Sequence, residues 1–284
     1  MSGKYLQKTR KENKVLPFAL IPFSFFFIEL FGFFFLSLDT ENYAADQLWP
    51  LAFGTLWTVI LSALIRLLPG IWARVAYGIA YFFAAVYAGF QTGYYILFSQ
   101  MMWLSDFRYA AEGSDYADML LTYPAGWWIG IITMIAVGVL LLWKFPRWQT
   151  RPLTCVLPIL LAVTCAVGTY CLPQAVFLHD SSIRYAGSDY GRSQSAEAAY
   201  TNMFNTHRLY QVCGLYQTAC KDIYANTIYL HTPGYVKAQE SAKAQIDAHF
   251  AEKGESGTNE MTGLLKGKNV VLVLMESMDD WMIG

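Results

Sequence analysis

Apolar positions dominate the first 172 residues of the chain and are grouped into five long stretches. Each stretch is long enough to cross a bilayer, which takes roughly 20 residues of helix. The stretches are Val15–Leu38, Trp49–Leu68, Ala73–Phe98, Pro124–Trp143 and Pro152–Leu172. The first is too long for the apolar core of a secretory signal and lacks a small-residue cleavage site. The pattern therefore predicts a mainly α-helical fold that begins with a five-helix transmembrane bundle, over residues 1–172.

Polar positions become frequent after residue 172, and the pattern changes to that of amphipathic helices. Ser193–Tyr224 is expected to form one or two such helices. Their apolar face would hold Tyr200, Phe204, Leu209, Val212 and Leu215. Pro233 begins another helical pattern that ends near Gly254, and Gly254–Lys268 has the composition of a linker. We expect residues 173–268 to form a helical linker outside the bundle.

The last part of the sequence has the pattern of a strand followed by a helix. Val270–Met275 is a continuous aliphatic run, typical of a strand buried on both faces of a parallel sheet. Glu276 follows it directly, and Ser277 and Asp280 have the spacing of a helix capping box. Ligands bind at the carboxyl ends of such strands, and a carboxylate there suits Mn²⁺ or Mg²⁺. The other interpretation is a strand that happens to be followed by an acid, with no metal.

Charge sets the predicted orientation of the bundle. Only 14% of the residues are charged, against about 25% in a typical soluble domain, and the net charge of -1 gives no basic field for nucleic acid. Ten basic residues precede the first stretch or flank the second and fourth connections: Lys4, Lys8, Arg10, Lys11, Lys14, Arg66, Arg74, Lys144, Arg147 and Arg151. The first and third connections are acidic and hold a single basic residue, Arg108. The positive-inside rule then places the N-terminus in the cytoplasm and the chain after residue 172 outside the cell membrane.

Glu29 is the one carboxylate well inside an apolar stretch. A charge at membrane depth is costly, so such a residue faces other helices or water and is a candidate functional group. The simpler interpretations are that it lies near the outer leaflet, reaches a polar neighbour or is protonated. Both readings stay open at this stage.

The cysteines and histidines give no pattern of a metal site. Cys213 and Cys220 would lie roughly 10 Å apart on a continuous helix, which is beyond the reach of a disulfide. Either the helix breaks at Gly214 or both thiols are free, and we expect them to be free and buried. In the third connection, Gln100–Leu121, the apolar residues near Asp106 indicate a short helix at the outer interface.

Several of these features together resemble the lipoteichoic acid synthase family, a membrane branch of the sulfatase and alkaline phosphatase superfamily. The five stretches, the helices around Asn202–Tyr224, the run Gly267–Ser277 and the segment Trp281–Gly284 carry the resemblance. It implies that residues 269–284 begin a sulfatase-like α/β catalytic domain. It also implies that Glu276 is a ligand of Mn²⁺ (or Mg²⁺).

The resemblance further implies a phosphoglycerol transferase with phosphatidylglycerol as donor. The acceptor would be a polyglycerolphosphate chain or a glycolipid. The family's threonine nucleophile would follow Gly284, so no catalytic residue is expected within this chain, which we interpret as an inactive N-terminal fragment. The alternatives are a phosphoethanolamine transferase or sulfatase of the same superfamily, or a non-catalytic membrane anchor or scaffold.

Overall fold

The structure is a computed structural model. It describes residues 15–37, 48–106, 119, 122–146, 148, 152–176, 196–203, 205–253, 257 and 259–269. Over these residues the fold is helical, with no strand, which confirms the mainly α-helical prediction for this part of the chain. The predicted strand Val270–Met275 and the predicted metal ligand Glu276 lie outside the described residues.

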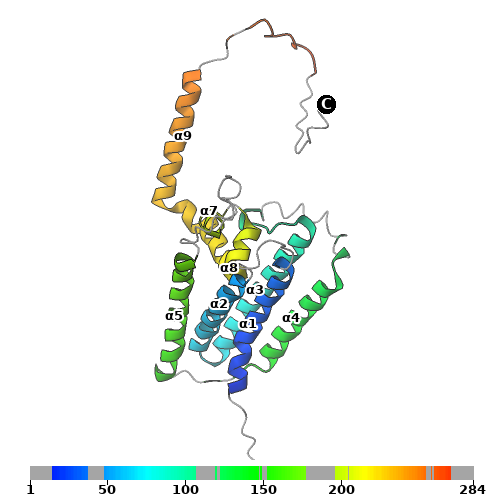
Figure 1. Cartoon of the computed structure of the whole chain (residues 1–284), viewed down its shortest axis with the longest axis vertical. Coiled ribbons are helices and arrows are strands. Elements are labelled where there is room, and N and C mark those ends of the chain that lie inside the picture. Colours follow the sequence, from blue (N-terminus) through cyan, green and yellow to red (C-terminus); the bar gives the residue numbers. More distant parts are fainter. Residues whose placement is uncertain are drawn as a thin grey trace, which may run out of the picture. The chain divides into compact units, whose positions relative to one another are not determined.

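Five helices are long and apolar enough to cross a membrane, which confirms that the five predicted apolar stretches form long helices. They are α1 (Val15–Leu36), α2 (Trp49–Leu67), α3 (Gly70–Phe98), α4 (Ala125–Trp143) and α5 (Pro152–Val176) (Figure 1). The spans end within a few residues of the predicted positions. The largest difference is at α5, which runs through Pro173 to Val176 because a proline near a helix end bends the backbone more often than it stops the helix in a membrane.

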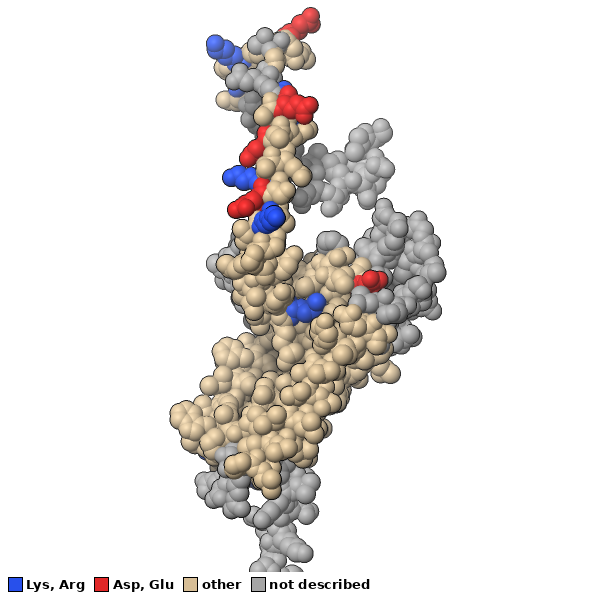
Figure 2. Space-filling view, turned by 90° about the vertical axis from the view of Figure 1, so that its left-hand side faces the viewer, with Lys and Arg blue, Asp and Glu red and all other residues tan. Residues whose placement is uncertain are grey.

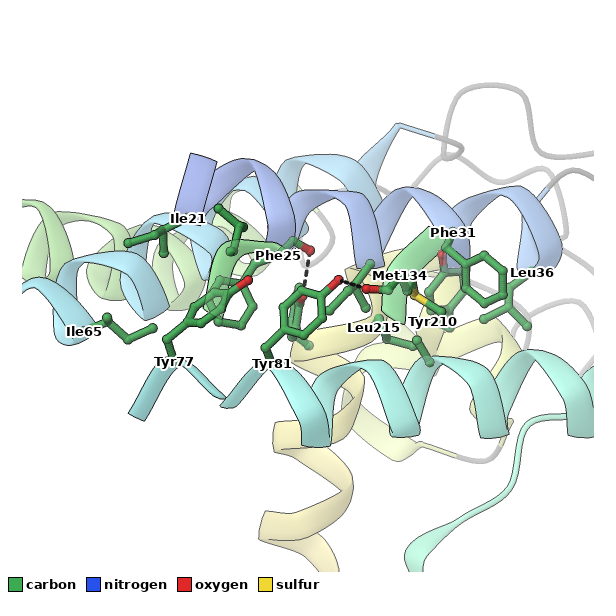
Figure 3. Close-up of a cluster of buried hydrophobic side chains, with 14 of the residues drawn as sticks. Ile21, Phe25, Phe31, Leu36, Ile65, Tyr77, Tyr81, Met134, Tyr210 and Leu215 are labelled. Atoms are coloured by element: carbon green, nitrogen blue, oxygen red, sulfur yellow. Dashed lines mark hydrogen bonds between the residues drawn. The ribbon is translucent and has the colours of Figure 1, made fainter. Parts of the chain in front are cut away.

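The core of the bundle forms around α1, which packs against α2, α3 and α4. Phe25 and Ile28 of α1 are fully buried, and Phe25 meets the rings of Tyr77 and Tyr81 on α3. The hydroxyl of Tyr81 donates to the carbonyl oxygen of Met134 on α4, 2.8 Å away (Figure 3). Aromatic packing and a few satisfied hydroxyls therefore hold these helices together.

The outward surfaces of the bundle are apolar. Large aliphatic and aromatic side chains on α3, α4 and α5 are more than half exposed, among them Phe83, Ile132 and Leu157. Figure 2 faces the α5 side of the molecule, and the apolar helices seen there carry almost no charged side chain. Along the helix over Pro233–Lys253, acidic and basic side chains alternate. Such a surface is compatible with a membrane protein whose outer faces meet lipid.

The same compact unit, which runs to Tyr229, also contains α7 (Ala196–Asn202), α8 (Thr206–Ile223) and the π-helical turn η2 (Tyr224–Ile228). α8 packs against α1 and α2 (Figure 1). Every side chain from Arg208 to Tyr216 is buried. The prediction of one or two helices is confirmed by α7 and α8, and Leu209, Val212 and Leu215 are buried as expected. The burial extends to polar residues such as Arg208 and Gln211, because α8 packs against α7 as well as against α1 and α2.

The second unit contains α9 (Pro233–Lys253), which confirms the helix predicted to begin at Pro233 and end near Gly254. α9 has no buried side chain. The described residues at 259–269 form exposed turns.

Candidate functional site

α8 consists of two half-helices joined at Gly214. The backbone of Gly214 has φ 73° and ψ 177°, a conformation that essentially only glycine adopts. A Cβ atom at this position would lie 2.7 Å from the carbonyl oxygen of Pro50 on α2. Glycine therefore serves two purposes here, since it allows the break and lets the backbone of α8 approach α2 closely.

Glu29 of α1 meets the break in α8. Its carboxyl oxygens accept the backbone N–H of Leu215 at 2.9 and 3.2 Å, and the N–H of Tyr216 also donates to it. These two N–H groups belong to the first turn of the second half-helix, where no partner exists within the helix itself. The carboxyl group thus caps the positive end of a half-helix that lies 186 residues later in the chain.

The space for this contact comes from another glycine. A Cβ atom at Gly54 of α2 would lie 2.3 Å from the Cγ of Glu29. The Glu29 side chain is fully buried. Glu29 could be a functional group or could have a simpler explanation, such as a polar neighbour. The structure shows a polar neighbour, the backbone of α8.

The break lies between the first turn of α2 and the middle of α1, where Glu29 is located. The Nε2 of His207, at the start of α8, is 2.6 Å from the carbonyl oxygen of Leu36, the last residue of α1. After the break, the hydroxyl of Tyr216 donates to the carbonyl oxygen of Phe25 at 2.7 Å. Glu29 is roughly 10 Å below Leu36 along α1, at 1.5 Å per residue.

α8 therefore enters the bundle at the end marked by Leu36 (the Leu36 end), turns at Gly214 and returns to the same end. A segment of this kind is a re-entrant helix. Irregular backbone at membrane depth is tolerated only where protein or a water-filled cavity surrounds it. Burial of Gly214 between α1 and α2 and capping by Glu29 meet that requirement.

Residues 101–106 are fastened across the Leu36 end. The side-chain amide of Gln91 donates to the carbonyl oxygen of Met102 at 2.8 Å and accepts the N–H of Met102 at 2.9 Å. The hydroxyl of Thr206 donates to the carbonyl oxygen of Met101, and the N–H of Leu104 donates to Asp222. Side chains from α3 and from both halves of α8 thus hold this segment in place.

The predicted interfacial helix within Gln100–Leu121 is represented in the described residues by a short 3-10 turn at 104–106. Most of the remaining residues of that prediction, including 107–118, lie outside the described part of the chain.

Asp222 is an ionisable group of this end that the fold buries. Its side chain is 4% exposed, and burial raises its pKa from 3.8 to about 6, against the opposing effect of two hydrogen bonds. One comes from the N–H of Leu104 and the other from the side-chain amide of Asn226, 2.6 Å away. The nearby carboxylate of Asp106 raises the pKa further.

The prediction that both thiols are free and buried is confirmed in part, since Cys213 and Cys220 are both free. The helix nevertheless breaks at Gly214, which was the alternative to free thiols, so the spacing on a continuous helix is not the reason that they are free. Cys213 is fully buried, with its thiol 3.2 Å from the carbonyl oxygen of Leu209. Cys220, however, is exposed, because the second half-helix turns that side away from the spans.

The described residues offer hydrogen bonding at this site and no metal centre. Among them, no three His, Cys, Asp or Glu side chains come together as metal ligands would. Glu276, the one metal ligand predicted from the sequence, lies outside these residues, so its role stays a prediction. The sequence singled out Glu29 and Gly214 separately, and no local pattern could have paired them.

Comparisons with known proteins found no matching family model, no matching curated protein and no matching solved structure. The resemblance to the lipoteichoic acid synthase family therefore rests on the residues of the sequence alone.

Proposed function

We propose that this chain forms the membrane-anchored N-terminal part of a metal-dependent phosphoglycerol transferase. The observation that carries the proposal is the run Gly267–Ser277, an apolar strand pattern that ends in an acid. It follows a unit with five helices long enough to cross a membrane, as expected for an enzyme whose donor is a lipid. The donor would be phosphatidylglycerol, and the acceptor a polyglycerolphosphate chain or a glycolipid.

The proposed reaction has two steps. In the family that the chain resembles, a threonine oxygen attacks the headgroup phosphorus, the bond between phosphorus and the diacylglycerol oxygen breaks, and diacylglycerol leaves. The covalent phosphoglycerol then passes to a hydroxyl of the acceptor. A Mn²⁺ or Mg²⁺ ion would supply stabilisation of the negative charge that develops on the phosphate.

The residues of this chain would have two parts in that reaction. Glu276 would contribute one carboxylate to the metal site, together with ligands from other segments of the catalytic domain. The membrane unit would keep the catalytic domain beside the leaflet from which the donor comes. The Leu36 end is the extracytoplasmic end in the predicted orientation.

The experiment starts from the whole gene, including the sequence beyond codon 284. The full protein is purified into vesicles that contain phosphatidylglycerol and is supplied with Mn²⁺, and release of diacylglycerol is measured. We expect release to depend on the metal. Release of diacylglycerol from phosphatidylethanolamine instead would favour the phosphoethanolamine transferase, and no release from either lipid would favour an anchor or scaffold.

Glu276→Gln tests the assigned ligand. We expect it to weaken activation by Mn²⁺ and to abolish transfer, because the amide offers the metal a neutral oxygen in place of a charged one. The matched control is Glu260→Gln, at an exposed position in the preceding turns, which should leave transfer unchanged. Full activity of Glu276→Gln at saturating Mn²⁺ would contradict the assignment.

A further inference from the structure

The last turns of α8 and the π-helical turn η2 present an exposed apolar stripe. Its members are spaced as on one face of a helix, and they are Cys220, Ile223, Tyr224, Thr227 and Ile228. Ile223, Tyr224 and Ile228 are 51%, 49% and 58% exposed. Among the described residues, the one charged side chain that borders this face is that of Lys221, whose ammonium group lies over the ring of Tyr200. We call the face the interfacial stripe.

Two polar side chains of the same segment, those of Asp222 and Asn226, point inward. Asp222 is buried and accepts the N–H of Leu104 from the 101–106 segment, and Asn226 donates to Asp222. On a helix that faces water, polar residues lie outside and apolar residues lie inside. The arrangement here is the reverse, which is the pattern of a helix whose outer face meets an apolar or interfacial medium.

The level of the stripe within the unit follows from the contacts of α8. Gly214 lies against Pro50 in the first turn of α2, and Leu215 after it donates to Glu29. Asp222, seven residues later, bonds to the segment that lies across the Leu36 end. Ile223 and the residues after it therefore lie near the Leu36 end of the apolar helices.

We propose that the interfacial stripe lies against the headgroup and upper acyl-chain region of the leaflet at the Leu36 end. The segment belongs to the same compact unit as the five spans, so its level relative to the bilayer is fixed by them. Like the outer surfaces of the bundle, the stripe is exposed and largely apolar. Tyrosine is enriched at this level of membranes, since its ring is apolar and its hydroxyl meets water.

The partner that we propose for the stripe is lipid. The stripe would place one side of the second half-helix against the bilayer. Glu29 binds the first turn of the same half-helix from within the bundle. The inference does not depend on the proposed transferase activity, because it concerns only residues of the membrane unit.

Site-directed spin labelling tests the proposal. A chain with all five native cysteines replaced receives a single cysteine by Ile223→Cys or Ile228→Cys, is labelled with a nitroxide and is reconstituted into phosphatidylcholine and phosphatidylglycerol vesicles. Collisions with O₂, which concentrates in lipid, are compared with collisions with a neutral nickel chelate, which stays in water. Ile135→Cys, on the exposed face of α4, is the lipid control, and Lys243→Cys, on exposed α9, is the water control.

We expect the ratio of O₂ to nickel collisions at residues 223 and 228 to exceed the ratio at residue 243 and to approach that at residue 135. A ratio equal to that at residue 243 would show that the stripe faces water and would overturn the proposal. Low collision rates with both reagents would show that protein covers the stripe, which would also overturn it. Because the substituted side chains are exposed, the labelled variants should fold as the parent does.

Discussion

Replacing Gly214 with alanine tests whether the break in α8 is imposed by the packing of the bundle. At φ 73° and ψ 177°, an L-residue is held in a conformation that costs about 1–3 kcal/mol. The added methyl group would also lie 2.7 Å from the carbonyl oxygen of Pro50, a backbone atom that cannot rotate away. Overpacking of this kind costs about 1–3 kcal/mol. The two effects together predict a loss of about 2–6 kcal/mol in the free energy of unfolding.

The assay is titration of the purified chain from mild detergent into SDS, with helix content followed by circular dichroism. The matched control is Gly126→Ala in α4, where an added Cβ has no atom within 4 Å. That change should be neutral or stabilising by up to about 1 kcal/mol, because alanine has the higher helix propensity.

Equal unfolding midpoints for Gly214→Ala and Gly126→Ala would refute the reasoning. Stabilisation by Gly214→Ala would refute it more strongly, since it would mean that α8 prefers to run as one continuous helix.

Three further predictions concern other parts of the molecule. Glu29→Ala should destabilise the unit by about 2–5 kcal/mol, because two buried N–H groups lose their acceptor. Glu29→Gln should destabilise it less, and the control Glu197→Ala, at an exposed site, should have almost no effect. SDS titration measures the stability of all three variants. Because the pKa of Asp222 is raised in the folded protein, this group makes stability fall as pH rises from about 4 to above 6. In thermal melts, Asp222→Asn should reduce that fall, whereas the control Asp247→Asn should not. An unchanged pH profile for Asp222→Asn would contradict the raised pKa of Asp222. In a chain whose native thiols are masked, a cysteine at Ser256 should react with an impermeant reagent on whole cells, and reaction only after lysis would reverse the predicted orientation.

The re-entrant helix couples distant parts of the chain. Glu29 near the start of the sequence holds the turn after Gly214, and Asp222 at the end of α8 holds the segment after α3. A substitution at any one of these groups should therefore alter the packing at the Leu36 end of the bundle. That end is also where the donor headgroup would be met if the proposed function is correct.

The five long apolar helices could be predicted from the sequence itself. A helix that crosses a bilayer needs about 20 consecutive apolar residues, and such a run can be recognised without knowledge of the tertiary structure. The start of α9 was equally local, since Pro233 favours the first turn of a helix. Each of these features depends on residues close together in sequence.

The tertiary structure alone decided the position of α8. Its amphipathic pattern predicted one apolar face, yet α1, α2 and α7 bury it on all sides from Arg208 to Tyr216. The partner of Glu29 was equally out of reach, because the hydrogen bonds to Leu215 and Tyr216 join positions far apart in the chain. A sequence shows that a buried carboxyl group needs a partner, but only packing determines which backbone comes within hydrogen-bonding distance.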